Sequence, residues 1–318
     1  MKVAYFGSGD FGLPTLQALA QRHEVVAVVS QPDRPAGRKR VLTPTPIAAW
    51  AVEQGIDVLK SEDVNEAEFV EKIEGMGLDA SVVIAFGQKL SPGLIGSMGT
   101  LAVNLHASLL PKYRGAAPIN WAMIQGEKQT GVSVIGLAQR MDAGEVYGTA
   151  ALEIEARETA GELHDRLAML GPGAVLGVLD DLERGELRPL DQDHSLATKA
   201  PKFKKADGTV DFSQSAFDVR CRVHGLTPWP GCRVNWRSKE SGEEKVLIIK
   251  RVDSEVGGSA GNAKPGEVLE GCEVAVGGGE KIKLLQVQAA GTKVMSAEAF
   301  AKGYHLGEGD VLSKLEVE

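Results

Sequence analysis

Uninterrupted apolar runs alternate with amphipathic stretches through the first half of the chain. The run at 25–29 is Val-Val-Ala-Val-Val, and the run at 80–85 is Ala-Ser-Val-Val-Ile-Ala. Because neither run offers a polar face to water, each is typical of a β-strand that is covered on both sides. Helical patterns separate such runs, for instance at Leu13, Leu16 and Leu19. Strands and helices that alternate in this way predict an α/β fold built on an open, mostly parallel sheet.

The second half of the chain has a different pattern. Residues 190–209 are polar and lysine-rich without a repeating period, which predicts a linker. Short strands separated by glycine-rich turns are expected at 232–236, 245–252, 266–270, 273–276 and 281–288, with a helix at 297–302 and a last strand near Val311. This order favours a small OB-type β-barrel. We therefore expect a Rossmann-like domain at 1–189 and an OB-like domain at 210–318.

Composition and charge limit the class of protein. Apolar residues make up 43% of the chain, yet no run approaches the ~18 consecutive apolar residues of a membrane span. The three cysteines have no metal-ligand spacing and suit reduced thiols. We therefore expect a cytoplasmic protein with no metal and no membrane contact. The net charge of −8 argues against a protein that coats nucleic acid with its whole surface.

A Gly-x-Gly-x-x-Gly pattern at 7–12 lies between the first expected strand and the first expected helix. The same pattern occurs in dinucleotide-binding folds, where an acid at the tip of the second strand holds the ribose. Here the second strand ends in Ser30-Gln31, and Asp33 lies beyond a proline in an expected loop. We therefore interpret the glycines as a tight turn and expect no NAD. An NAD-dependent oxidoreductase remains an alternative, which nicotinamide binding would test.

Asn104, His106 and Asp142 are the strongest candidates for a chemical centre. Asn104 and His106 lie on one expected strand with a single residue between them, so their side chains share a face. Asp142 lies in a tight Met-Asp-Ala-Gly loop between two apolar strands. Acyl transfer to an amine passes through an oxyanion to which an amide and a protonated imidazole can donate, and a carboxylate can order a water that accepts the amine's proton. The three residue types therefore indicate transfer of a small acyl group.

The stretch Asn104-x-His106-x-Ser108-Leu-Leu-Pro-x-Tyr-Arg-Gly, followed by Asp142-x-Gly144, resembles the signature of the folate-dependent formyltransferases. The resemblance implies that a formyl group moves from 10-formyltetrahydrofolate, the co-substrate, to an amine. It also implies that Asn104, His106 and Asp142 are the catalytic residues. The folate-binding residues that it implies are Ser108, Leu109, Leu110, Pro111 and, by its place after the fourth strand, Gln88.

The acceptor amine differs among members of that family. They formylate glycinamide ribonucleotide, sugar nucleotides or the methionine carried by initiator tRNA, and this chain is similar throughout its length to the tRNA-specific members. The cations expected to contact tRNA are Arg34, Arg38, Lys39, Arg40 and Lys202. We thus expect a monomeric enzyme that acts on methionyl initiator tRNA in translation initiation. A sugar nucleotide or another small amine remains an alternative acceptor, and a non-catalytic tRNA-binding module is an alternative function.

Overall fold

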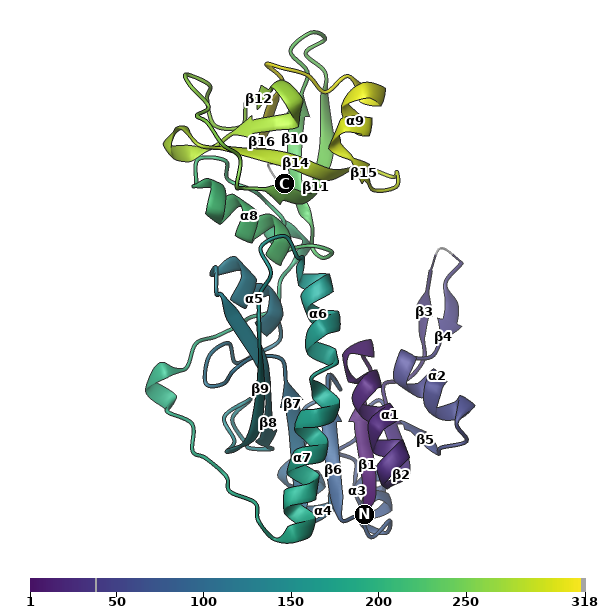
Figure 1. The fold of residues 1–318 in the computed structure, drawn as a ribbon. Helices are drawn as coiled ribbons and strands as arrows, with labels where there is room; N and C mark the ends of the chain where they lie inside the picture. The colour runs from purple at the N-terminus through teal and green to yellow at the C-terminus, as the bar shows by residue number, and fades with distance from the viewer. Residues whose placement is uncertain (38, 316–318) are drawn as a thin grey trace. The chain divides into compact units, whose positions relative to one another are not determined.

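The computed structural model describes residues 1–37 and 39–315, and the chain divides into two compact units. Unit 1 consists of residues 1–115, 130–152 and 164–199, and unit 2 consists of 116–129, 153–163 and the residues from 200 onward. Each unit therefore collects segments from separate parts of the sequence (Figure 1). Within the described ranges, every helix is too short or too polar to span a lipid bilayer.

Unit 1 is built on a seven-stranded sheet. In spatial order its strands are β5 (Val58–Lys60), β2 (Glu24–Ser30), β1 (Lys2–Gly7), β6 (Ala80–Ile84), β7 (Leu101–His106), β8 (Gln129–Gly136) and β9 (Val146–Glu153). Neighbouring strands from β5 to β7 pair in parallel, and β8 joins β7 in the antiparallel sense. The central strands are buried because helices cover both faces. The predicted α/β fold with a mostly parallel sheet is confirmed.

Side-chain caps define the starts of several helices in unit 1. The helical segments are a 3-10 turn at Asp10–Gly12, α1 (Leu13–Arg22), α2 (Pro46–Glu53), α3 (Ala67–Glu74), α4 (Pro92–Ser97), α7 (Gly171–Arg184) and a 3-10 turn at His194–Leu196. Helix α6 (Ala160–Ala168) begins in unit 2 and continues into unit 1 from residue 164. The hydroxyls of Thr45 and Ser91 accept a backbone N–H in the first turns of α2 and α4. Helices α1 and α7 pack against each other beside the sheet (Figure 1).

The glycine turn at 7–12 is explained by the packing of Tyr5, whose side chain is fully buried. A Cβ on Gly12 would lie 1.8 Å from the Tyr5 hydroxyl oxygen. A Cβ on Gly7 would lie 2.5 Å from the ring carbon Cε1. Only glycine therefore leaves room for the ring at these two positions, and this packing accounts for Gly7 and Gly12 of the motif.

The basic segment near residue 34 forms a hairpin where the sequence suggested a loop. Strands β3 (Arg34–Ala36) and β4 (Val41–Thr43) pair antiparallel and lie apart from the seven-stranded sheet (Figure 1). Val41 and Leu42 are 60% and 67% exposed. The hairpin therefore presents apolar as well as basic side chains to solvent.

Unit 2 contains a separate antiparallel sheet. In spatial order its strands are β12 (Val268–Leu269), β13 (Glu273–Ala275), β14 (Lys281–Ala289), β11 (Glu244–Asp253), β10 (Cys232–Arg237) and β16 (Val311–Lys314), with β15 (Met295–Ser296) paired to β14. Further backbone hydrogen bonds join the chain at β12 to the chain at β16, the first and last strands of this sheet. Val268 N donates to the Asp310 carbonyl at 2.8 Å, and Leu312 N donates to the Gly266 carbonyl at 2.7 Å. The first and last strands are thus connected.

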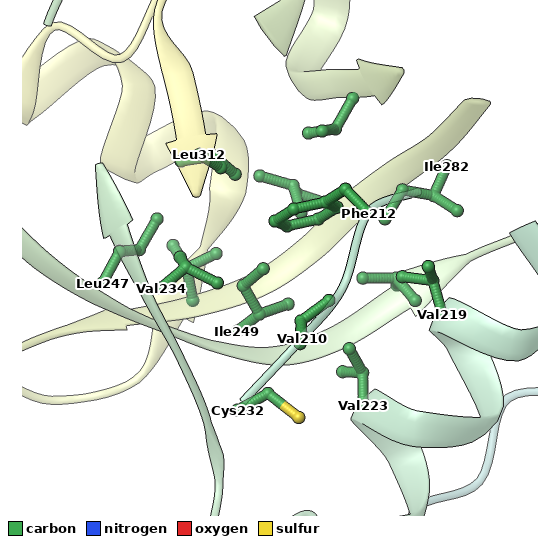
Figure 2. Packing of buried hydrophobic residues seen from close by; sticks show 14 of the residues in the cluster. Val210, Phe212, Val219, Val223, Cys232, Val234, Leu247, Ile249, Ile282 and Leu312 are labelled. Atoms are coloured by element: carbon green, nitrogen blue, oxygen red, sulfur yellow. The ribbon is translucent and has the colours of Figure 1, made fainter. Parts of the chain in front are cut away.

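Apolar side chains from a helix and the sheet meet in the core of unit 2 (Figure 2). The helical segments of this unit are α5 (Pro118–Ile124), α8 (Ala216–Gly225), α9 (Ala297–Tyr304) and 3-10 turns at Lys205–Asp207, Glu270–Cys272 and Gly277–Gly279. Val219 and Val223 of α8 face Val210 and Cys232, and all four residues are buried. Each such aliphatic side chain contributes about 1.5–3 kcal/mol relative to exposure, which holds α8 against the sheet.

Candidate active site

Two of the candidate catalytic residues lie at the carboxyl end of β7. Asn104 is opposite Val83 of β6, and His106 is opposite Ser133 of β8. Because β6 and β7 are parallel, their carboxyl ends lie at the same edge, where open α/β sheets place ligands. His106 is 6% exposed, whereas Asn104 is half-buried. The Asn104 amide makes no hydrogen bond to another residue of the described chain, so its N–H groups remain available.

The His106 ring lies between two oxygen atoms. Its Nε2 is 2.9 Å from the backbone carbonyl oxygen of Tyr113, and its Nδ1 is 3.7 Å from Asp142 Oδ2. Since a carbonyl oxygen can only accept, Nε2 carries a hydrogen and donates it to Tyr113. The structure thus brings His106 and Asp142 together, with the other ring nitrogen facing the carboxylate.

The loop that carries Asp142 is tightly constrained. Asp142 adopts a left-handed backbone conformation with φ of 54°, which short polar side chains tolerate better than most. A Cβ on Gly144 would lie 1.9 Å from the Gly136 carbonyl oxygen, so this position requires glycine. Gly115 N donates to Asp142 Oδ2 at 2.8 Å. The carboxylate is therefore anchored through one oxygen, the same one that faces His106.

The segment after β7 is shaped by two buried serines. Ser108 is fully buried, and its hydroxyl donates to the Lys112 carbonyl at 2.7 Å. The Ser133 hydroxyl donates to the Ser108 carbonyl at 2.7 Å. These contacts leave Leu109, Leu110 and Pro111 half-buried, so they offer apolar surface next to the catalytic candidates.

A residue that the sequence analysis missed completes the site. Gln192 donates from Nε2 to the carbonyl oxygens of Asp142 and Gly144, at 2.9 Å and 2.7 Å. Its Oε1 accepts from Arg114 Nε at 3.1 Å. Gln192 lies in the polar stretch that predicted a linker, and no spacing rule connects it with Asp142. Only the fold brings the two together.

Burial and the neighbouring Arg140 lower the pKa of Arg114 from its ordinary value, while Asp142 opposes that shift. Among residues 1–37 and 39–315, no group of three or more His, Cys, Asp or Glu side chains is placed to share a metal ion.

Comparison with known families covers both units. Residues 1–179 match the formyl transferase family, and residues 202–305 match the formyl transferase C-terminal domain. The chain belongs to the formyl transferase family. It is 40% identical to the methionyl-tRNA formyltransferase of Citrifermentans bemidjiense, over 99% of this chain and 97% of that one. It is 36% identical to the methionyl-tRNA formyltransferase of Bacillus subtilis, over 98% and 97%.

Solved structures of formyl transferases share the fold at lower identity. The sugar 3N-formyl transferase WlaRD, crystallised in the presence of dTDP and 5-N-formyl-THF, superposes with a TM-score of 0.67. It is 14% identical and aligns over 92% of this chain and 99% of its own. At this identity the likeness establishes the shared fold.

Gln88 takes a structural position in this formyl transferase. Its Nε2 donates to the Ser61 carbonyl at 2.8 Å, and its Oε1 accepts from Val64 N at 3.1 Å. Both ends of the amide are thus engaged in holding the loop before α3. Contact between Gln88 and folate stays a prediction.

The candidate tRNA-binding cations occupy exposed positions in both units. Arg34, Lys39 and Arg40 are exposed in the hairpin region of unit 1, and Lys202 is exposed in unit 2. Arg34 pairs with Glu62 at 2.6 Å, whereas Lys39 and Arg40 form no ion pair within the described chain. Arg38 lies outside the described residues.

Proposed function

We propose that this formyl transferase moves a formyl group from 10-formyltetrahydrofolate to the α-amino group of methionine on initiator tRNA, and so supports translation initiation. The observation that carries the proposal is the His106–Asp142 pair, 3.7 Å apart at the end of β7. It occurs in a chain whose full length aligns with methionyl-tRNA formyltransferases at 40% identity. A sugar nucleotide is a less favoured acceptor, because the sugar-specific relative is 14% identical.

In the proposed reaction, the methionine amine attacks the formyl carbon. A C–N bond forms, the bond between the formyl carbon and N10 of the folate breaks, and N10 takes up a proton as it leaves. Asn104 donates a hydrogen bond to the oxyanion of the tetrahedral intermediate. His106 donates a second one from Nδ1–H when its ring is protonated, because Nε2 is held by Tyr113 while Nδ1, 3.7 Å from Asp142, makes no hydrogen bond to the carboxylate. Asp142 orders a water that accepts the proton from the attacking amine. The substrate amine is the nucleophile, so no serine or cysteine is required.

The folate donor is proposed to lie along the loop after β7. The half-buried side chains of Leu109, Leu110 and Pro111 support this placement because they provide apolar surface for the donor's ring system. Ser108 shapes the backbone of the same loop through its buried hydroxyl. Gln88 would act by positioning the neighbouring loop at 61–64.

The tRNA is proposed to contact cations of both units. Lys39 and Arg40, together with Arg34 and Arg38, would neutralise phosphates at unit 1, and Lys202 would do so at unit 2. We assign the functional domains to 1–189 and 210–318, joined by 190–209, of which residues 190–199 pack with the catalytic unit. The backbone hydrogen bonds that join residues 266–268 to residues 310–312 support an OB-type barrel for the second domain, a fold that binds nucleic acids.

The enzyme is proposed to act as a monomer in the cytoplasm. Its three cysteines are free and buried, which suits a reducing compartment.

The decisive experiment measures formyl transfer from 10-formyltetrahydrofolate to methionyl initiator tRNA. The parent protein is compared with an Arg38→Ala, Lys39→Ala, Arg40→Ala variant. Loss of three phosphate contacts should lower affinity about 10-fold or more and flatten the dependence on salt. A matched control carries Lys72→Ala, Arg184→Ala and Arg188→Ala, three exposed cations of the same unit.

A rate of formyl transfer that falls in the variant of residues 38–40 but not in the control variant supports the proposal. If the parent binds the folate donor but formylates no tRNA, the acceptor is wrong. A sugar nucleotide or another small amine would then be the next substrate to assay.

A further inference from the structure

The Gln192 side chain forms hydrogen bonds with three residues of the candidate active site: Arg114, Asp142 and Gly144. Its side chain is 8% exposed, and its amide is fully used. The nitrogen donates to the carbonyls of Asp142 and Gly144, and the oxygen accepts from Arg114. Because both hydrogens and the oxygen have partners, the orientation of this amide is fixed by its contacts.

These contacts hold a strained backbone in place. Asp142 has a φ of 54°, a left-handed conformation that residues other than glycine rarely adopt unless their surroundings impose it. The two carbonyls that receive the Gln192 hydrogens lie on either side of Ala143. Gln192 therefore fixes the short turn that aims the Asp142 carboxylate at His106 and at Gly115 N.

The same side chain joins a second loop to the first. Arg114, which binds Gln192 through its guanidinium, also lies 2.8 Å from His194 Nδ1, and its backbone N donates to the Thr198 carbonyl at 2.9 Å. The neighbouring Tyr113 supplies the carbonyl that receives the His106 hydrogen. Asp142 is thus held by Gln192, and the 113–114 segment is held by Gln192, His194 and Thr198.

We propose that Gln192 is a positioning residue for formyl transfer and acts through Asp142. The proposal rests on the function proposed above, because it requires Asp142 to take part in the reaction. Gln192 does not touch the substrate. It sets the position of the carboxylate, so its loss reduces the rate of the chemical step and leaves binding of the tRNA nearly unchanged.

The test is a double-mutant cycle on kcat. Gln192→Glu keeps an acceptor for Arg114 but replaces the donor to two carbonyls with a second acceptor. We expect this change to lower kcat about 10- to 100-fold in the parent, with KM for methionyl-tRNA within about 2-fold. In an Asp142→Asn background the same change should lower kcat less than about 2-fold, because both act on one group.

Ser195→Ala is the matched control, since Ser195 is exposed in the same segment and bonds to Asp193. Its kcat should equal that of the parent. Gln192→Ala provides a second variant with the same expected pattern, and melting temperatures show that each protein is folded.

Two outcomes overturn the inference separately from the function. If Gln192→Glu lowers kcat by the same factor in both backgrounds, Gln192 has a general structural role and the inference is wrong. If it raises KM for tRNA with kcat unchanged, Gln192 serves binding. A parent that formylates no methionyl-tRNA would instead refute the proposed function, and Asp142→Asn with the parent's kcat would remove the role through which Gln192 is proposed to act.

Discussion

His106 Nε2 lies 2.9 Å from the backbone carbonyl oxygen of Tyr113, and this contact determines which ring nitrogen carries a hydrogen. A carbonyl cannot donate, so the Nε2–H is fixed and Nδ1 is left facing Asp142. At 3.7 Å from Asp142 Oδ2, Nδ1 makes no hydrogen bond to the carboxylate and is the ring nitrogen left for the substrate. The main chain of Tyr113 therefore orients the imidazole, whatever side chain that position carries.

Replacing His106 with alanine should abolish transfer without weakening the binding of tRNA. The ring is 6% exposed and cannot contact phosphates, whereas loss of a donor to the oxyanion lowers kcat about 100- to 1,000-fold. Single-turnover rates and filter binding on the same tRNA measure the two effects. An affinity loss as large as the rate loss would contradict the assigned role.

Gly12→Ala should destabilise the protein by about 3 kcal/mol, because its Cβ would overlap the Tyr5 hydroxyl oxygen at 1.8 Å. Tyr5→Phe removes that oxygen, which has no hydrogen-bond partner among the described residues, and should recover part of the loss in the double variant. Urea unfolding gives the free energies. Gly173→Ala is the control, since a Cβ at that position would meet no atom within 4 Å and the helix should become more stable. If Gly12→Ala lowers the free energy of unfolding equally in the parent and in the Tyr5→Phe variant, overlap with the hydroxyl is not the cause.

Stability should fall in mild acid because of His224. Its side chain is 2% exposed, its Nε2 accepts from Val252 N at 3.1 Å, and burial lowers its pKa to about 4. The unfolded chain, with a histidine pKa of about 6.5, binds more protons between these values, so this contribution is complete above pH ~6.5 and is lost as the pH falls toward 4.

The parent should therefore lose about 2 kcal/mol more than a His224→Gln variant between pH 7.5 and pH 5. Glutamine keeps an acceptor for Val252 N but does not titrate. The free energy of unfolding in urea at the two pH values provides the measurement. The same pH dependence in both proteins would exclude His224 as the cause.

The three cysteines should resist thiol reagents in the folded protein. Cys232 is fully buried and burial raises its pKa to about 12, while burial also raises the pKa of Cys221 and Cys272. Because the thiolate is the reactive form, labelling at pH 8 should be slow and should become complete in denaturant. Rapid labelling of the native protein would show that the core of unit 2 opens readily.

The strands and helices of the sheet were predictable because their signals are local. The run at 25–29 needs only its own apolar side chains to indicate a buried strand, and β2 is found there. The hairpin at β3 and β4 was missed because its strands are three residues each and include Pro35, which gives no alternating pattern. Short exposed strands are specified by pairing, and pairing is invisible in a single sequence.

The site divides in the same way. Asn104 and His106 could be placed together from strand geometry alone, and Asp142 could be recognised as a loop carboxylate. Gln192 could not be found, because its partners lie 48, 50 and 78 positions earlier in the chain. The polar, aperiodic composition of its segment predicts a connector but does not reveal that Gln192 contacts the Asp142 turn.

The path of residues 190–199 through the catalytic unit has a consequence for recombination. A fragment ending at residue 189 would carry the Asp142 turn without Gln192 and the 113–115 loop without Thr198. Natural or designed exchange of C-terminal modules should therefore splice after Lys199, where the compact unit itself ends. Residues 190–199 should therefore be kept with the catalytic unit, and only residues 200–209 should be free to change with the C-terminal domain and its substrate.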